Sequence, residues 1–337
     1  MTRRSWLLMG LLGALWGASY LFIKVALDDG VDPVFLVFAR LALGALVLVP
    51  IAMRQGALQA LGGRRGPIAF MAFVQVVFPF LLITYGERHV ASSLTGIIVS
   101  AAPIFTVLIA ARYDDEERPR GIAAAGVVLG ILGVVLLFGV DLSGDAAALA
   151  GGLMVLLASL GYAIGGLYLK HRLRGVPALG IAASTLAVGA VALAPVALFA
   201  LPSAMPATKA TASLVILGAG GTGIAFLVYY TLIAQIGPAR ASLVAYIAPG
   251  FAVLYGVWLL SEPLTAGALL GLVLILAGSW IAAEGGCRDG RGSRRRRRWS
   301  RRPRARRRSA GGRDWPNIRS VIATRPRYSR DTNVSGV

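Results

Sequence analysis

Long apolar stretches, separated by short breaks that contain charge, glycine or proline, fill most of the first 283 residues of the chain. Each stretch is close to the ~20 residues that an α-helix needs to cross the ~30 Å hydrocarbon core of a bilayer. The pattern therefore predicts an all-α membrane protein with ten transmembrane helices. Their expected positions are residues 5–27, 33–53, 67–86, 91–111, 121–138, 149–169, 178–200, 212–235, 239–260 and 265–283.

Composition agrees with this class of protein. The chain is 57% hydrophobic and only 15% charged, whereas soluble domains are roughly 45–50% apolar. The first apolar stretch follows Arg3 and Arg4, as in a signal peptide, but it runs on into more helix. We therefore interpret it as a retained first span.

The sequence repeats itself with a shift of about 146 residues. Matches that include charged residues and proline are not explained by apolar bias alone. They are Lys24 with Lys170, Pro103 with Pro249, and Glu116 with Glu262. We expect a first five-helix unit at residues 1–140 and a second at 141–283. An odd number of helices in each unit makes the two units enter the membrane from opposite sides, and such inverted repeats are typical of transporters with a site near the midplane.

Basic residues predict the orientation. With the N-terminus inside, twelve lysines and arginines lie in inner loops, and three (Lys24, Arg88 and Lys209) lie outside. Cytoplasmic loops carry the excess of positive charge in membrane proteins. We therefore expect both termini to be cytoplasmic.

Arg40 lies within the second predicted span, and an arginine that faces lipid there costs several kcal/mol. It either binds an anionic group of a substrate or holds neighbouring helices together. Lys24 ends the first span and Lys170 the sixth. Both can reach the interface along their apolar stems, and for Lys24 substrate binding is the alternative.

Aromatic residues deep in the predicted spans need a hydrogen-bond partner or a wet cavity. Together with Arg40 and Lys24, we expect them to line a substrate-binding cavity, although aromatic anchors at the membrane interface are a common alternative. They are Trp16, Tyr20, Tyr85, Tyr162, Tyr230 and Tyr246. Pro103 and Pro249 lie mid-span at equivalent positions, where each is expected to kink its helix and shape the cavity.

Two sets of acidic residues lie near the ends of spans. Glu87 and His89, with Arg88 between them, are in the turn after the third span and could relay protons; a solvated turn is the more common interpretation. Glu116 and Glu262 each precede a span, where a carboxylate can cap free amides. We expect a structural role for that pair.

Enzyme chemistry is not expected. No aspartate lies inside a predicted span, and the two histidines are not mid-span. A lone cysteine, Cys287, excludes an internal disulfide and a multi-cysteine metal site, and no phosphate-binding loop of the Gly-Lys-Ser/Thr type is present. No cofactor and no metal are therefore predicted.

Residues 284–337 differ in character, with 18 arginines, four acidic residues and a net charge of +14. We expect a disordered cytoplasmic tail. It would be drawn to anionic inner-leaflet lipid. RNA or DNA binding is a sharper alternative that we do not expect, and a third interpretation is that the tail is incidental to function.

Several short motifs in the chain together resemble those of a known family. They are LWGASYLFIK at residues 15–24, Ala39-Arg40, the Ala-Pro steps at 102–103 and 248–249, Glu116 and Glu262, and glycine pairs at 126/133 and 271/278. Together with ten spans in two copies, they resemble the EamA-like family of the drug/metabolite transporter superfamily over residues 5–283.

The resemblance implies a secondary transporter of the inner (plasma) membrane, often an exporter of amino acids or other metabolites, with a small molecule as its substrate. It names neither the substrate nor the oligomeric state. The second copy departs from the pattern, because Leu186 stands near where the first copy has Arg40. A non-transporting membrane scaffold, with the basic tail recruiting lipid or nucleic acid, is the alternative function.

Overall fold

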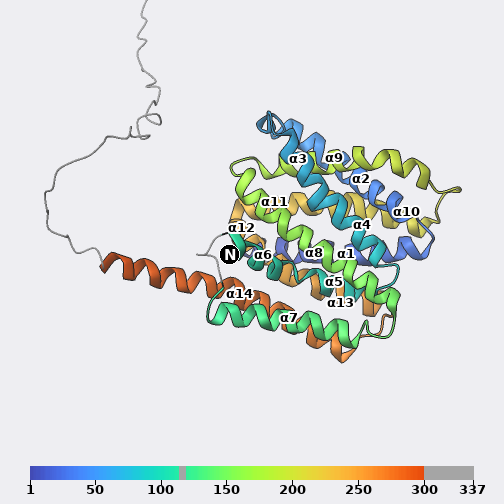
Figure 1. Ribbon diagram of the computed structural model, residues 1–337. Helices are drawn as coiled ribbons and strands as arrows, with labels where there is room; N and C mark the ends of the chain where they lie inside the picture. Colours follow the sequence, from blue (N-terminus) through green and yellow to red (C-terminus); the bar gives the residue numbers. More distant parts are fainter. Residues whose placement is uncertain (114–118, 300–337) are drawn as a thin grey trace, which may run out of the picture. The chain divides into compact units, whose positions relative to one another are not determined.

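The computed structural model describes residues 1–113 and 119–299, and those residues form helices joined by short connections, with no strand among them (Figure 1). The first half contains α1 (Arg3–Asp28), α2 (Pro33–Arg54), α3 (Arg65–Met71), η2 (Ala72–Val77), α4 (Phe78–Gly86), α5 (Ser92–Val99), α6 (Ala102–Tyr113) and α7 (Ile122–Val140). The second contains α8 (Ala146–Arg172), α9 (Ala178–Ala197), α10 (Thr208–Val215), η5 (Ile216–Ile224), α11 (Ala225–Ile236), α12 (Pro238–Ala241), α13 (Val244–Leu260) and α14 (Ala266–Trp299). Short 3₁₀ turns lie at Gln59–Leu61 and Leu198–Ala200.

Within the described ranges, eight continuous helical segments are long and apolar enough to cross a membrane. Two shorter apolar helices, Val244–Leu260 and Ala266–Ala282, follow them. These ten segments lie where the apolar pattern predicts spans, with ends shifted by a few residues. The all-α class of the fold is therefore confirmed.

Side chains close the free ends of several helices. The Thr2 hydroxyl accepts a hydrogen bond from the first turn of α1, and the Asp32 carboxylate accepts one from Val34 N at 2.7 Å at the start of α2. Asp145 caps α8 in the same way, from Ala147 N at 2.8 Å. Helix N-termini leave backbone N–H groups without intrahelical partners, and these short polar side chains satisfy them. The caps fix where three of the long apolar segments begin.

Two of the long segments contain π-helical turns, in which the hydrogen bond spans five residues. The turn η2 interrupts Arg65–Gly86, and η5 interrupts Thr208–Ile236. These are the third and eighth apolar segments, so the interruptions lie at corresponding places in the two halves. Apolar periodicity does not predict them, and π-helical turns are frequent at functional sites.

The two prolines that were expected to kink their helices differ in the structure. Pro249 lies inside the continuous helix α13 and is buried. Pro103 lies in the first turn of α6, because the fourth apolar segment breaks into α5 and α6 after Val99. The fourth apolar segment, Ser92–Arg112, is thus interrupted directly before Pro103, near the middle of its length. A proline in a first turn loses no helical hydrogen bond, since its N–H would be unpaired there anyway.

Helix packing also corresponds between the halves. Helix α1 packs along α13 and α5, and α8 packs against α4, α5 and α6. Helices α2 and α9 pack directly against each other. The π-helical turn η5 lies against α2, and η2 lies against α9. These neighbours place the side chains of α1, α2, α4, α8 and η5 around a common interior.

Glycines let the last helices of the two halves approach closely. A Cβ atom built on Gly278 of α14 would lie 2.6 Å from Gly126 O and 2.7 Å from Gly130 Cα of α7. A Cβ atom on Gly133 would lie 2.9 Å from Gly271 O. Small residues at helix interfaces permit such contact in membranes. The glycine pairs noted in the sequence therefore lie at one interface.

Large apolar side chains are exposed on the outside of the bundle, as a lipid-facing surface requires. Leu46 is 70% exposed, Val191 74% and Trp258 77%. The predicted tail starts differently from expectation, because α14 continues to Trp299 instead of ending near 283. Arginine is a good helix former, so the helix can continue beyond its apolar part into the basic segment. Residues 300–337, and Glu116, lie outside the described residues.

Candidate functional site

Arg40 of α2 points into the interior of the bundle and is only 7% exposed. Its Nε donates a hydrogen bond to Thr222 Oγ1 of η5, at 2.9 Å. The guanidinium carbon lies 3.7 Å from the centre of the Phe80 ring of α4, a cation–π contact. Arg40 therefore does not face lipid, and its partners come from both halves of the chain.

The π-helical turn positions Thr222. Its hydroxyl donates a hydrogen bond to Leu217 O, five residues earlier, at 3.0 Å. The oxygen lone pairs then remain free to accept from Arg40. The sequence does contain a signal for this site, a hydroxyl residue within the glycine-rich run at 218–223, but the pairing with a residue 182 positions away cannot be derived from spacing.

Two tyrosines predicted to line a cavity lie beside Arg40. Tyr20 of α1 and Tyr162 of α8 lie within electrostatic range of the guanidinium and of each other. The Tyr20 ring also lies over Gly96 of α5, where a Cβ atom would be 3.4 Å from the ring. Arg40, Thr222, Phe80, Tyr20 and Tyr162 form what we call the Arg40 cluster.

Arg40 forms no direct ion pair with a carboxylate of the described residues. Within residues 1–113 and 119–299, no carboxylate lies within 4 Å of its nitrogens, and its side chain makes no hydrogen bond besides the one to Thr222. An arginine carries five N–H donors. The bond from Nε to Thr222 uses one of them, so the four on the two terminal nitrogens have no partner among the described residues. The fork of N–H groups on a guanidinium matches the geometry of a planar anion such as a carboxylate.

Lys24 and Glu87 lie next to the Arg40 cluster, at the ends of α1 and α4. Lys24 Nζ donates to the backbone carbonyl of Glu87 at 3.1 Å and lies 3.7 Å from the Asp28 carboxylate. Glu87 is 0% exposed, whereas Arg88 and His89 in the same turn are exposed. The interpretation of this turn as a solvated trio is therefore wrong for Glu87.

Glu262 joins the two halves at the same end of the bundle. Its carboxylate accepts hydrogen bonds from Ser92 N at 2.7 Å and Ser93 N at 2.9 Å, at the start of α5. The expected capping role is confirmed, but the capped helix belongs to the first half and is not the helix that follows Glu262 in sequence. The positive end of the helix dipole, at the N-terminus of α5, also favours a carboxylate at this position.

The remaining predicted site residues lie elsewhere. Trp16 packs against Phe226 and Tyr229 of α11, with ring centres 6.3 and 5.2 Å apart, and Tyr230 stacks on Phe226 at 5.9 Å. Tyr246 makes an edge contact with Trp280 at 5.7 Å. Tyr85 is half-buried in α4. The structure therefore gathers Tyr20, Arg40 and Tyr162 directly, and places the other aromatics in separate contacts.

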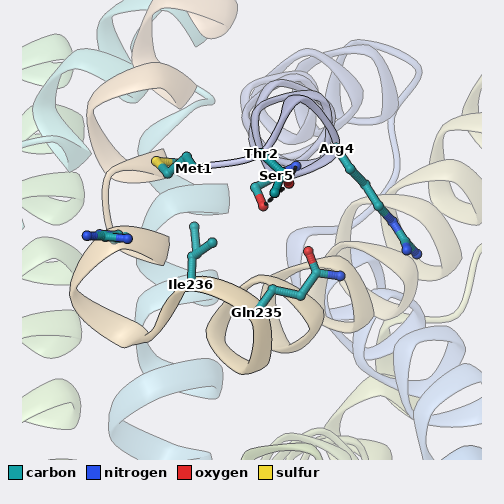
Figure 2. A pocket seen from close by; sticks show the side chains of 7 residues that line it. Met1, Thr2, Arg4, Ser5, Gln235 and Ile236 are labelled. Carbon is teal, nitrogen blue, oxygen red and sulfur yellow. Dashed lines mark hydrogen bonds between the residues drawn. The ribbon is translucent and has the colours of Figure 1, made fainter.

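A hollow of about 630 Å³ lies at the other end of α1, between its first turn and the end of α11 (Figure 2). Figure 2 shows Thr2 and Ser5 hydrogen-bonded to each other, with Gln235 and Ile236 across the hollow. None of the predicted site residues lines it. The described part of the chain also holds no group of three His, Cys, Asp or Glu side chains that could bind a metal ion.

Comparison with known proteins shows which family this chain is similar to. The model of the EamA-like transporter family matches residues 4–139 and 149–283. The uncharacterized transporter YoaV of Bacillus subtilis (strain 168) is 28% identical over 271 residues, covering 79% of this chain and 92% of that protein. The uncharacterized inner membrane transporter YedA of Escherichia coli (strain K12) is 27% identical, covering 80% of this chain and 89% of that protein.

Two further similarities are informative. A protein of Escherichia coli (strain K12) named as a probable amino-acid metabolite efflux pump is 27% identical, covering 85% of this chain and 96% of that protein. One protein crystal structure superposes with a TM-score of 0.60 over 84% of this chain and 98% of the other, at 21% identity. That level of identity shows a shared fold alone.

Proposed function

The chain belongs to the EamA-like transporter family, and we propose that it is a secondary transporter that exports an amino acid or a related small metabolite. Its relatives are named as transporters, one of them as an inner membrane transporter and one as a probable amino-acid metabolite efflux pump. The proposed location is accordingly the inner (plasma) membrane, with both termini in the cytoplasm.

The observation that carries the proposal is the buried guanidinium of Arg40. A buried charge without a paired carboxylate costs several kcal/mol in the membrane. If Arg40 served only to hold α2 and η5 together, a neutral side chain that bonds to Thr222 would do so without that cost. The free donors of Arg40 suit the α-carboxylate of an amino acid. Tyr20, Tyr162 and the Phe80 ring supply aromatic walls for the rest of the molecule.

Alternating access is the proposed mechanism, with two inverted five-helix halves rocking about a site near the midplane. Supporting it are the repeat in the sequence, the π-helical turns at corresponding places and the corresponding helix contacts. Arg40 belongs to the first half and Thr222 to the second, so relative motion of the halves would open and close the binding cluster.

Other residues take supporting roles in this proposal. Lys24, Trp16, Tyr85, Tyr230 and Tyr246 are proposed to line the route that the substrate follows once the halves separate. Pro103 and Pro249 would shape the helices on which that route depends.

The test is a comparison of the culture medium of cells that overexpress the wild-type protein, Arg40→Gln or Arg54→Gln. Arg54 ends the same helix and is exposed, which makes it a matched control. We expect one or a few amino-acid-like metabolites to accumulate outside cells with the wild-type protein and with Arg54→Gln, and not with Arg40→Gln. Equal accumulation with Arg40→Gln would refute the assignment of the site.

One further arm separates a transporter from a membrane scaffold that acts through its basic tail. Deleting residues 300–337 leaves export intact if the helical bundle is the transporter. Loss of all function on deletion, with no effect of Arg40→Gln, would instead support the scaffold.

A further inference from the structure

Glu87 is the most unusual ionisable group beside the Arg40 cluster. The side chain is fully buried, and neither carboxylate oxygen has a hydrogen-bond partner among the described residues. Lys24 lies close by but bonds to the backbone carbonyl of Glu87 and to Asp28. An ionised carboxylate without partners is strongly disfavoured in such a place, whereas a neutral carboxyl is tolerated.

Charged groups face Glu87 from several parts of the fold. Besides the exposed Arg88 and His89 on its own turn, these are Lys24 and Asp28 at the end of α1, Arg40 of α2, and Glu262 after α13. Burial has the largest effect and raises the pKa of the Glu87 carboxyl well above its ordinary range. Lys24 opposes this effect and Glu262 adds to it.

The location of Glu87 connects it to the substrate as well. Glu87 interacts electrostatically with both Arg40 and Tyr20. An amino acid whose carboxylate binds Arg40 carries an ammonium group a few atoms away, and that cation needs an anionic partner. An ionised Glu87 is the acidic group that lies buried beside the cluster.

We propose that Glu87 is the proton-binding residue of this transporter, and that a proton and the ammonium group of the exported amino acid compete for its carboxylate. The proposal rests on the proposed function and names its coupling ion. In this proposal Glu87 carries the proton whenever no substrate is bound.

Competition for one carboxylate produces exchange. When the cluster opens to the cytoplasm, Glu87 releases its proton there, and the substrate binds with its carboxylate on Arg40 and its ammonium on Glu87. When the cluster opens outward, the substrate leaves and an external proton returns to Glu87. One proton enters for each amino acid exported, so the proton gradient drives export.

A first experiment needs no substrate. Infrared spectra of the purified full chain in lipid, recorded from acidic to alkaline pH, distinguish a protonated carboxyl from a carboxylate by its C=O stretch. At neutral pH we expect a carboxyl band that Glu87→Gln removes and Asp29→Asn keeps, since Asp29 is an exposed carboxylate at the same end. An identical band in wild-type protein and Glu87→Gln would overturn the proposal.

A second experiment measures coupling in liposomes that contain a pH-sensitive dye. A mixture of the standard amino acids is added outside without a pH gradient. Wild-type protein and Asp29→Asn should make the lumen alkaline as amino acids enter and protons leave. Glu87→Gln mimics the protonated residue and offers no anion to the ammonium group of the substrate, so it should lose both this pH change and the exchange of labelled for unlabelled amino acid. Its unfolding transition should match that of the wild-type protein, which shows that it is folded.

The outcomes separate the two proposals. Amino-acid movement in the wild-type protein without a pH change, or an undiminished pH change with Glu87→Gln, contradicts the role of Glu87 and leaves the proposed function standing. A wild-type protein that moves no amino acid at all contradicts the proposed function, and the coupling role fails with it.

Discussion

The hydrogen bond between Arg40 and Thr222 gives a sharp test of the geometry described above. Thr222→Val keeps the shape of the side chain but removes the hydroxyl that accepts from Arg40 Nε at 2.9 Å. Thr231→Val is the matched control in the same apolar segment, because its exposed hydroxyl bonds only to Leu227 O, at 2.8 Å. Both changes lose one hydroxyl, but only one of them leaves a buried cation without its partner.

The expected magnitude follows from that burial. Hydrogen bonds between transmembrane helices average ~0.6 kcal/mol and reach ~1.7 kcal/mol, and bonds to charged groups are worth ~1.5–3 kcal/mol. Because Arg40 is only 7% exposed, water cannot easily replace the lost hydroxyl. We expect Thr222→Val to lower the free energy of unfolding by about 1.5–2 kcal/mol, and Thr231→Val by less than about 0.5 kcal/mol.

The assay is equilibrium unfolding of the purified protein in mixed detergent micelles, with the proportion of denaturing detergent increased stepwise. Each threonine variant is also made in an Arg40→Met background, which completes a double-mutant cycle. In that background the cost of Thr222→Val should fall towards that of Thr231→Val. Equal costs for the two threonine variants, or an unchanged cost of Thr222→Val without Arg40, would refute the reasoning.

Two further predictions use the same unfolding assay. Glu262→Ala removes the acceptor of both Ser92 N and Ser93 N, so we expect a loss of about 1–2 kcal/mol and a smaller one for Glu262→Gln; no loss for the alanine variant would contradict the cap. Gly278→Val places side-chain atoms against the backbone of α7, with an expected cost of about 1–3 kcal/mol, whereas Gly139→Val, where a Cβ atom meets open space, should cost nothing measurable. Equal stability of the two glycine variants would contradict the close approach of α7 and α14.

Helix positions were predictable because membrane crossing imposes a length. The apolar pattern predicts a span at residues 33–53, for example, and α2 occupies Pro33–Arg54, since Asp32 caps it and, apart from Arg40, the helix is apolar up to its last residue. Interruptions within the spans were not predictable. The turns η2 and η5 carry no clear signal in the sequence, because they lie inside long segments that are apolar overall.

The candidate site was predictable only in part. Arg40 stands out because a mid-span arginine is costly in lipid, and its burial agrees with that expectation. Thr222 is marked only by the glycine-rich run around it, and Phe80 is not marked at all, since a phenylalanine is ordinary in an apolar segment. The sequence places Glu87 in a turn and gives no sign of its burial, which depends on how the ends of the helices pack in three dimensions.

The most direct test of the central claim is amino-acid exchange by the purified protein in liposomes. Vesicles are loaded with unlabelled amino acids, and entry of the labelled mixture is followed for wild-type protein, Arg40→Gln and Arg54→Gln. If Arg40 binds the substrate, the wild-type protein and Arg54→Gln exchange amino acids and Arg40→Gln does not. Exchange that persists undiminished in Arg40→Gln would contradict this role of Arg40.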